Sequence, residues 1–131
     1  MTSRIKQLQV AVSGYDAVAY FDGQAIAGDP AFSSSQNDGL YHFSSEANKQ
    51  KFDAAPERYS PLYGGYCATA ASEGKLFGVD PTNFKITGDN RLALFYRGAG
   101  GDTLPQWNEN EAERRAAADK HWREGSFEAH A

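Results

Sequence analysis

The sequence predicts an α+β fold, with a small antiparallel sheet, short helices packed on it and a C-terminal helix. Short apolar segments separated by Gly, Asn and Asp fill the first half of the chain, as in strands joined by tight turns. Helix-capping residues and helical spacing recur later, and a charged segment of helix length follows residue 108. The 131 residues, of which 40% are hydrophobic, fit one modest core.

Four strands and two turns are expected before residue 45. The strands are expected at residues 18–21, 24–26, 31–33 and 40–44. Asp22-Gly23 predicts a hairpin turn, and a second turn is expected at 37–39. Alternation along 40–44 places Tyr41 and Phe43 on one face, which we expect to be buried.

Two helices are expected next. Ser44 or Ser45 caps a helix that ends at about residue 54, with Phe52 as its apolar anchor and Pro56 preventing its continuation. The spacing of Tyr63, Tyr66, Cys67 and Ala70 predicts a second short helix over 65–73. Gly74 is expected to stop that helix.

The rest of the chain returns to strands before a final helix. Strands are expected at 77–79, 83–87 and 91–96, with a turn at 88–90 and a loop at 98–101. Asn108 and Glu111 resemble a capping box, and Gly125 predicts the end of the helix that they begin. Its expected apolar contacts are Ala118, Trp122 and Trp107. No internal repeat is expected.

Composition narrows the function classes. The net charge of −4 argues against a dedicated nucleic-acid binder. The apolar stretches are too short to span a bilayer, so no membrane insertion is expected. A single cysteine, Cys67, excludes an internal disulfide and zinc sites built from several cysteines. Residues 1–12 do not form a signal peptide, which predicts a cytoplasmic protein or an exported one whose leader has been removed.

Several motifs follow one another in the order found in YHS-domain proteins. They are Ser13 to Phe21, Tyr41 to Ser45, Pro56 to Tyr59, Tyr63 to Cys67, Asp80-Pro81, Phe84 to Ile86 and Ala118-Asp119 with Trp122. Over roughly residues 10–123 the chain resembles the stand-alone YHS domain-containing (seleno)protein group most closely. The resemblance implies one YHS-like domain over 13–124, with an extension at 1–12 and a tail at 125–131. It also implies binding of a metal ion, with copper as the usual suggestion.

The chain departs from the metal-associated members of that family. Those members often have cysteines in the opening motif, where this chain has Gly14 and Ala17. They also often have cysteines after the aromatic strand, where this chain has Ser44, Ala47 and Asn48. A metal site with several cysteines is therefore not expected here.

Cys67 is the main candidate site residue. A thiolate is both a nucleophile and a soft-metal ligand, and a position after Gly64-Gly65 at a helix start favours the anion. The alternative is a small buried hydrophobic residue. His42 is a candidate second metal ligand, and the alternative is a hydrogen-bonded or surface histidine on a strand.

The residues expected to line a pocket around the cysteine come from two parts of the sequence. They are Tyr15, Asp16, Tyr63, Gly64, Gly65 and Tyr66. The alternative for the tyrosines is a ring in the core with its hydroxyl at the surface, and Asp16 is alternatively a structural residue. No phosphate-binding loop, nucleophile elbow or paired-histidine zinc helix is present in the sequence, so no catalytic residue is assigned.

The sequence therefore predicts a soluble, non-catalytic module that binds a soft metal ion, copper, through Cys67. One alternative is a thiol redox or sensor protein that acts through Cys67, and another is a protein-interaction domain without a metal. A metal binder should hold a second ligand near the thiol, whereas a redox protein should expose the thiol. An interaction domain should expose an apolar surface. An oligomer remains open.

Overall fold

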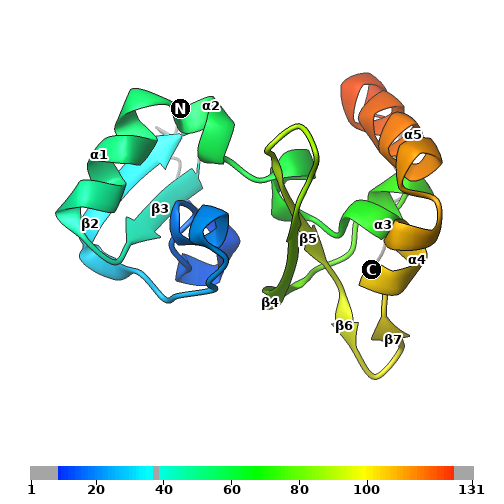
Figure 1. Cartoon of the computed structure of the whole chain (residues 1–131), viewed down its shortest axis with the longest axis horizontal. Helices are drawn as coiled ribbons and strands as arrows, with labels where there is room; N and C mark the ends of the chain where they lie inside the picture. Colours follow the sequence, from blue (N-terminus) through cyan, green and yellow to red (C-terminus); the bar gives the residue numbers. More distant parts are fainter. Residues whose placement is uncertain (1–8, 37–38, 126–131) are drawn as a thin grey trace, which may run out of the picture. The chain divides into compact units, whose positions relative to one another are not determined.

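The computed structural model describes residues 9–36 and 39–125. These residues fall into two compact units that divide between Glu57 and Arg58 (Figure 1). The mixed α+β class is confirmed, but the strands form three small sheets rather than one. Among the described residues, no helix is both long enough and apolar enough to cross a membrane.

The N-terminal unit contains a three-stranded sheet in the order β1-β3-β2. Its elements are β1 (Gln9–Val10), η1 (Ala11–Gly14), η2 (Ala19–Asp22), β2 (Asp29–Gln36), β3 (Gly39–Phe43) and α1 (Glu46–Ala54). A further helix, α2 (Pro56–Tyr59), spans the division between the units. Strand β3 pairs in parallel with β1 and antiparallel with β2.

The core of this unit forms as the alternation in β3 predicts. Tyr41 and Phe43 are buried, and their rings pack on Phe52 of α1 at centroid distances of 4.7 and 5.0 Å. The Ser45 side chain caps α1 by accepting a hydrogen bond from the Asn48 amide. The predicted anchor and cap of α1 are therefore confirmed.

Two strand predictions in this unit are wrong. Residues 18–21 bend into η2, because the Asp16 side chain accepts hydrogen bonds from the amides of Val18 and Ala19. Gly23, with φ of 83°, then closes η2 instead of forming a hairpin turn. Residues 24–26 form no strand. The turn expected at 37–39 includes residues 37–38, which lie outside the described residues.

The C-terminal unit contains two small antiparallel sheets and four helical segments. Its elements are η3 (Leu62–Gly65), α3 (Ala68–Ser72), β4 (Asp80–Ile86), β5 (Leu92–Phe95), β6 (Arg97–Gly98), β7 (Gly101–Asp102), α4 (Leu104–Glu109) and α5 (Glu111–Glu124). Strand β4 pairs with β5, and β6 pairs with β7. The core is built from buried side chains of η3, α3, β5, α4 and α5, with Trp107 against Phe95 at a centroid distance of 5.7 Å.

The strongest predicted strand is confirmed, since all four residues of β5 are buried. The turn at 88–90 is also present, closed by a hydrogen bond from the Thr87 amide to the Arg91 carbonyl (2.8 Å). Residues 77–79 are not a strand. The helix expected over 65–73 covers only Ala68–Ser72, because Tyr63, Gly64 and Gly65 have positive φ values that an α-helix excludes.

The final helix begins later than predicted. Asn108 lies inside α4, and the chain breaks at Asn110 before α5 starts at Glu111. Gly125 ends α5 with φ of 65°, as predicted. Trp107 and Ala118 are buried, whereas the Trp122 side chain is 44% exposed and only its ring edge meets Tyr63.

Candidate functional site

Cys67 is completely buried at the start of α3. Its amide donates a hydrogen bond to the carbonyl of Phe77 (3.0 Å), and its Sγ accepts one from the amide of Ala70 (3.4 Å). The side chain therefore serves as the N-terminal cap of a five-residue helix. This geometry matches the alternative interpretation of Cys67 as a structural residue.

The Thr103 hydroxyl covers the other side of the sulfur. Its Oγ1 lies 3.3 Å from Cys67 Sγ and donates a hydrogen bond to the carbonyl of Tyr96 (3.2 Å). A hydroxyl carries one proton, so the proton in the sulfur contact comes from the thiol. The described geometry thus holds Cys67 as a neutral thiol that both donates and accepts a hydrogen bond.

His42 lies half-buried on β3, opposite Ser33 of β2. It belongs to the N-terminal unit, whereas Cys67 belongs to the C-terminal unit, so the predicted pairing of these two residues as metal ligands stays a prediction. Within residues 9–36 and 39–125, no group of three or more His, Cys, Asp or Glu residues could hold a metal ion.

Asp16 is a fully buried carboxylate whose oxygens are already occupied. Besides the amides of Val18 and Ala19, it accepts hydrogen bonds from the Ser44 amide, the Ser44 hydroxyl and the Asn48 side chain, all between 2.7 and 2.8 Å. Burial raises the pKa of Asp16, but the hydrogen bonds from Asn48, Ser44 and Ala19 outweigh it and hold the pKa below its usual value. Asp16 therefore fixes the chain around it as an ionised acceptor.

The other predicted pocket residues divide between the units. Tyr15 lies in the N-terminal unit, where it pairs with Ala27. In the C-terminal unit, Tyr63 is buried and donates a hydrogen bond to Asp119 (2.7 Å), and burial together with Asp119 raises the pKa of its phenol. Gly64 and Gly65 precede Tyr66, which is 41% exposed. A pocket shared by all these residues stays a prediction.

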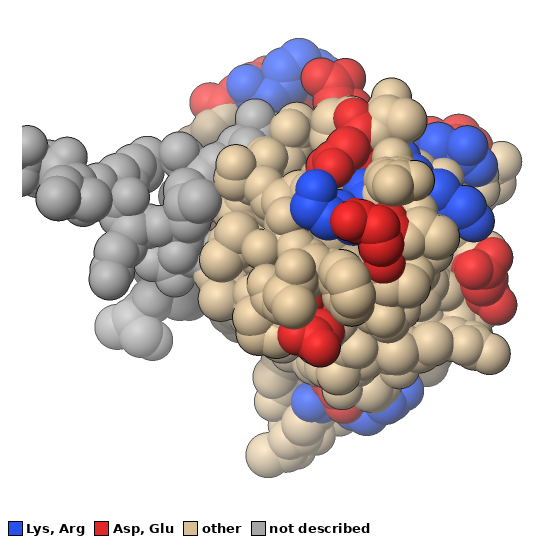
Figure 2. Space-filling view, turned by 90° about the vertical axis from the view of Figure 1, so that its left-hand side faces the viewer, with Lys and Arg blue, Asp and Glu red and all other residues tan. Residues whose placement is uncertain are grey.

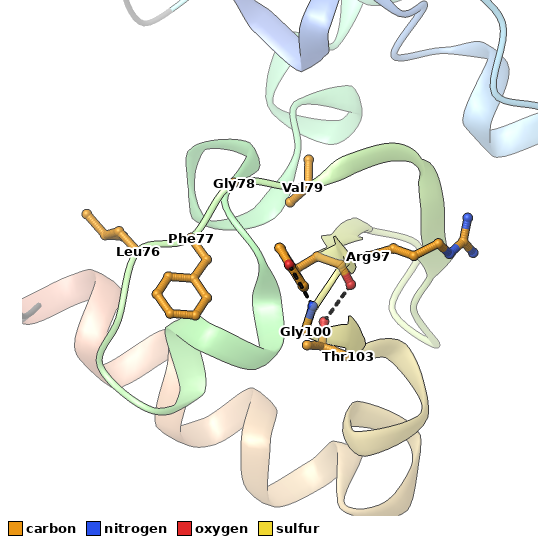
Figure 3. Close-up of a pocket in the computed structure, with 8 residues that line it drawn as sticks. Leu76, Phe77, Gly78, Val79, Arg97, Gly100 and Thr103 are labelled. Atoms are coloured by element: carbon orange, nitrogen blue, oxygen red, sulfur yellow. Dashed lines mark hydrogen bonds between the residues drawn. The ribbon is translucent and has the colours of Figure 1, made fainter. Parts of the chain in front are cut away.

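The C-terminal unit has an open groove of about 860 Å³ beside the buried cysteine. Its lining comes from the segment after α3 and from the β6–β7 hairpin (Figure 3), namely Leu76, Phe77, Gly78, Val79, Tyr96, Arg97, Gly100 and Thr103. Leu76, Phe77, Val79 and the ring of Tyr96 make most of this lining apolar, and Phe77 is 38% exposed. Thr103 joins the groove to Cys67, since its hydroxyl contacts the sulfur.

The charge of Arg97 is neutralised at the edge of the groove. Its guanidinium lies 3.5 Å from Asp80 and 3.6 Å from Asp102, and it points away from Phe77, Val79 and Gly100 (Figure 3). Hydrogen bonds from Thr82 lower the pKa of Asp80, and those from Leu104 and Asn83 lower the pKa of Asp102. Both carboxylates therefore stay ionised at neutral pH, and an anionic ligand would find no free cation at Arg97.

A buried amide braces the hairpin that forms one side of the groove. Asn83 is 1% exposed, and its side chain donates to the Tyr96 carbonyl (3.3 Å) and to the Asp102 carboxylate (2.8 Å). Its Oδ1 accepts a hydrogen bond from Arg97 (3.1 Å). Because the Thr103 amide also donates to the Tyr96 carbonyl (3.1 Å), the base of the hairpin is closed. The groove wall is thus held by side chains from β4.

Sequence reasoning missed this groove. Residues 77–79 were expected to pair as a strand, and residues 98–101 were expected to be a plain loop. The available signal was the concentration of small residues in both segments, with Gly78 in one and Gly98, Ala99, Gly100 and Gly101 in the other. Glycine leaves backbone open to a ligand, but composition alone does not bring segments twenty residues apart together.

Charged side chains of both signs lie close together on the side of the molecule shown in Figure 2, next to a wide area without charge. Ion pairs within elements contribute to such mixing, for example Lys49 with Asp53 on α1 (2.9 Å). A mixed surface of this kind supplies no extended field of a single sign.

No protein-family model, curated protein or solved structure matches this chain. The resemblance to YHS-domain proteins and the copper site therefore stay predictions.

Proposed function

We propose that this protein is a non-catalytic binding module that takes an extended polypeptide segment of a partner protein into the groove of the C-terminal unit. The observation that carries the proposal is the open, mainly apolar groove between residues 76–79 and the braced hairpin 96–103. Among the functions considered from the sequence, an exposed apolar surface favours an interaction domain. The burial of Cys67 does not favour a reactive thiol.

The chemistry of the lining supports a polypeptide over an anionic small molecule. The walls offer aliphatic and aromatic surface for side chains, whereas the nearest cation, Arg97, is already paired with two carboxylates. Gly78 lies in the lining, and a Cβ built on it would meet no atom within 4 Å. Its bare backbone is therefore accessible to the amides and carbonyls of an incoming chain.

Filling the groove tests the proposal. Gly78→Trp places a large side chain in the open space of the groove without meeting a neighbour at Cβ. Gly88→Trp is the matched control, because Gly88 has equally open space around its Cβ and lies in the β4–β5 turn of the same unit. Neither glycine has a φ in the left-handed region, so both substitutions avoid that backbone strain.

The probe is a library of random dodecapeptides displayed on phage and selected on the wild-type protein. We expect enriched peptides with apolar side chains, retained by Gly88→Trp and weakened about tenfold or more by Gly78→Trp. Equal binding to the two variants, or no enrichment on the wild type, contradicts the proposal. Binding of a small apolar dye that Gly78→Trp blocks, without any enriched peptide, would reassign the groove to small molecules.

A further inference from the structure

We infer that the two units are copies of one structural module, shifted by 51 residues, and that the hairpin Arg97–Asp102 is an insertion in the second copy that builds the groove. The second part of this inference rests on the proposed function. The first part rests on backbone geometry alone. It revises the expectation that the chain has no internal repeat.

The first observation is an uncommon backbone conformation that occurs twice. The two 3-10 segments, Ala11–Gly14 and Leu62–Gly65, are 51 residues apart. Each contains three consecutive residues in the left-handed region, with φ values of 55°, 54° and 81° at 12–14 and of 57°, 62° and 87° at 63–65. Residues other than glycine rarely adopt this conformation, and runs of three are rarer.

The hydrogen bonds that follow each triplet also correspond. Four backbone pairs repeat with the same shift: Tyr15 to Val12 and Tyr66 to Tyr63, Asp16 to Ile26 and Cys67 to Phe77, Gly23 to Tyr20 and Gly74 to Ala71, and Gln24 to Ala19 and Lys75 to Ala70. The side chains of Asp16 and Cys67 cap the following turn in the same way, by accepting from the amides of Ala19 and Ala70. Asp16 and Cys67 are therefore equivalent positions.

The strands extend the correspondence. Strand β2 begins at Asp29 and β4 at Asp80, and each Asp is followed by Pro. Asp29 pairs with Phe43 and Asp80 with Phe95, and in both pairs the register shifts over the next four residues. Both carboxylates also accept a hydrogen bond from the amide two residues later, at 2.9 Å. A single shift thus relates a turn, a cap and a hairpin.

Sequence identity at this shift is concentrated where the geometry requires it. The identical pairs within residues 12–34 are Gly14 and Gly65, Tyr15 and Tyr66, Ala17 and Ala68, Ala19 and Ala70, Gly23 and Gly74, Asp29 and Asp80, and Pro30 and Pro81. Gly14, Gly65, Gly23 and Gly74 all have positive φ values. A chance resemblance of one local turn would not keep the same shift through the strands.

The two copies differ after the second strand. In the first, Phe43 is followed directly by Ser44, whose hydroxyl donates to Asp16 (2.7 Å), and then by α1. In the second, β6 and β7 intervene before Thr103, whose hydroxyl contacts Cys67, and then α4 begins. Ser44 and Thr103 therefore occupy one place in the module, and the hairpin lies between Tyr96 and Thr103.

The segment that forms the other groove wall also differs between the copies. Gly28, which corresponds to Val79, lies tightly on β3, since a Cβ there would come within 2.4 Å of the His42 backbone. Gly78 in the second copy has open space instead. The inserted hairpin supplies Arg97 and Gly100 to the lining, with Tyr96 and Thr103 at its base. The groove is thus a feature of the second copy that its hairpin helps to build.

Two variants of the full chain test the inference. The first removes Arg97–Asp102 and joins Tyr96 to Thr103, whose backbone atoms are already hydrogen-bonded. It also carries Asn83→Phe, because Asn83 would lose Asp102 and because Phe32 is the corresponding residue of the first copy. The second variant inserts the same six residues between Phe43 and Ser44, at the equivalent place of the first copy.

We expect both variants to unfold cooperatively in denaturant. The deletion should bind the peptides selected on the wild type about tenfold more weakly or worse. If neither variant folds, the units are not interchangeable copies and the inference fails. If the deletion folds and binds the peptides as tightly as the wild type, the hairpin does not build the site and the proposed function fails instead. Folding of the insertion variant alone supports the copies, and Gly78→Trp then decides the function.

Discussion

Asp16 of the N-terminal unit and Cys67 of the C-terminal unit hold the same place with different chemistry. Asp16 is an ionised acceptor with five hydrogen bonds from three segments, whereas Cys67 has one acceptor contact and one thiol proton to donate. The comparison teaches that a buried, isolated cysteine can be explained as the cap of a turn. It also teaches that the position tolerates a carboxylate only where enough donors surround it.

The largest expected effects come from the aromatic anchor of each unit. Phe52→Ala and Trp107→Ala should each cost about 3–5 kcal/mol, because both side chains are buried against a strand aromatic and leave a cavity. Denaturant unfolding measured with two-dimensional NMR would show which unit loses its signals. A cost below about 1 kcal/mol for either variant would mean that its unit does not depend on that anchor.

Asp16→Ala is expected to cost more than Cys67→Ala, at about 3 kcal/mol against about 1 kcal/mol. The first substitution leaves several buried donors without an acceptor, whereas the second leaves mainly the Ala70 amide. Chemical denaturation of the two variants under one set of conditions provides the measurement. Equal costs would contradict the difference in chemistry between the two positions.

The same carboxylate makes a pH dependence predictable. The pKa of Asp16 is held below its ordinary value of 3.8, so its contribution to stability is present above about pH 4 and is lost as pH falls through the lowered pKa. The difference in unfolding free energy between the wild type and Asp16→Asn should therefore be largest near neutral pH and shrink in acid. A difference that stays constant down to about pH 2 would show that the pKa of Asp16 is not lowered by folding.

The smallest perturbation is alkylation of Cys67. The buried thiol should react with iodoacetamide at least about tenfold more slowly in the folded protein than in denaturant. Rapid reaction in the folded protein would contradict the described burial. The copper prediction is checked separately by titrating the reduced protein with Cu(I) against a chelator, and equal affinity of the wild type and Cys67→Ser would end it.

Local signals in the sequence predicted the elements that depend on local physics. Ser45, Phe52, Gly125 and the apolar run of β5 each act within a few residues, and each has the expected role. The strand expected at 18–21 failed because the Asp16 side chain offers its amides a competing partner. Hydrophobic pattern alone does not contain that competition.

The candidate site could be predicted only in part. Cys67 was singled out, and it lies one hydroxyl from the groove, but its burial depends on Thr103, which is 36 residues away. The groove itself depends on a hairpin held by Asn83 and Arg97, whose types do not indicate a ligand. The repeat escaped notice because its defining features are φ values and hydrogen bonds, and Asp16 and Cys67 do not look alike.

The division of the chain between Glu57 and Arg58 has a consequence for synthesis. The contacts of the first unit are complete once its own residues have left the ribosome, so it can fold before the second unit is made. Neighbouring copies of one module also carry a hazard, since a strand of one copy can pair with the partner strand of the other. The order of synthesis lowers that hazard, because β2 and β3 pair while β4 and β5 are still unmade. Different residues at equivalent places, such as Ser34 bonded to Asp53 in the first copy and Lys85 bonded to Glu111 in the second, lower it further.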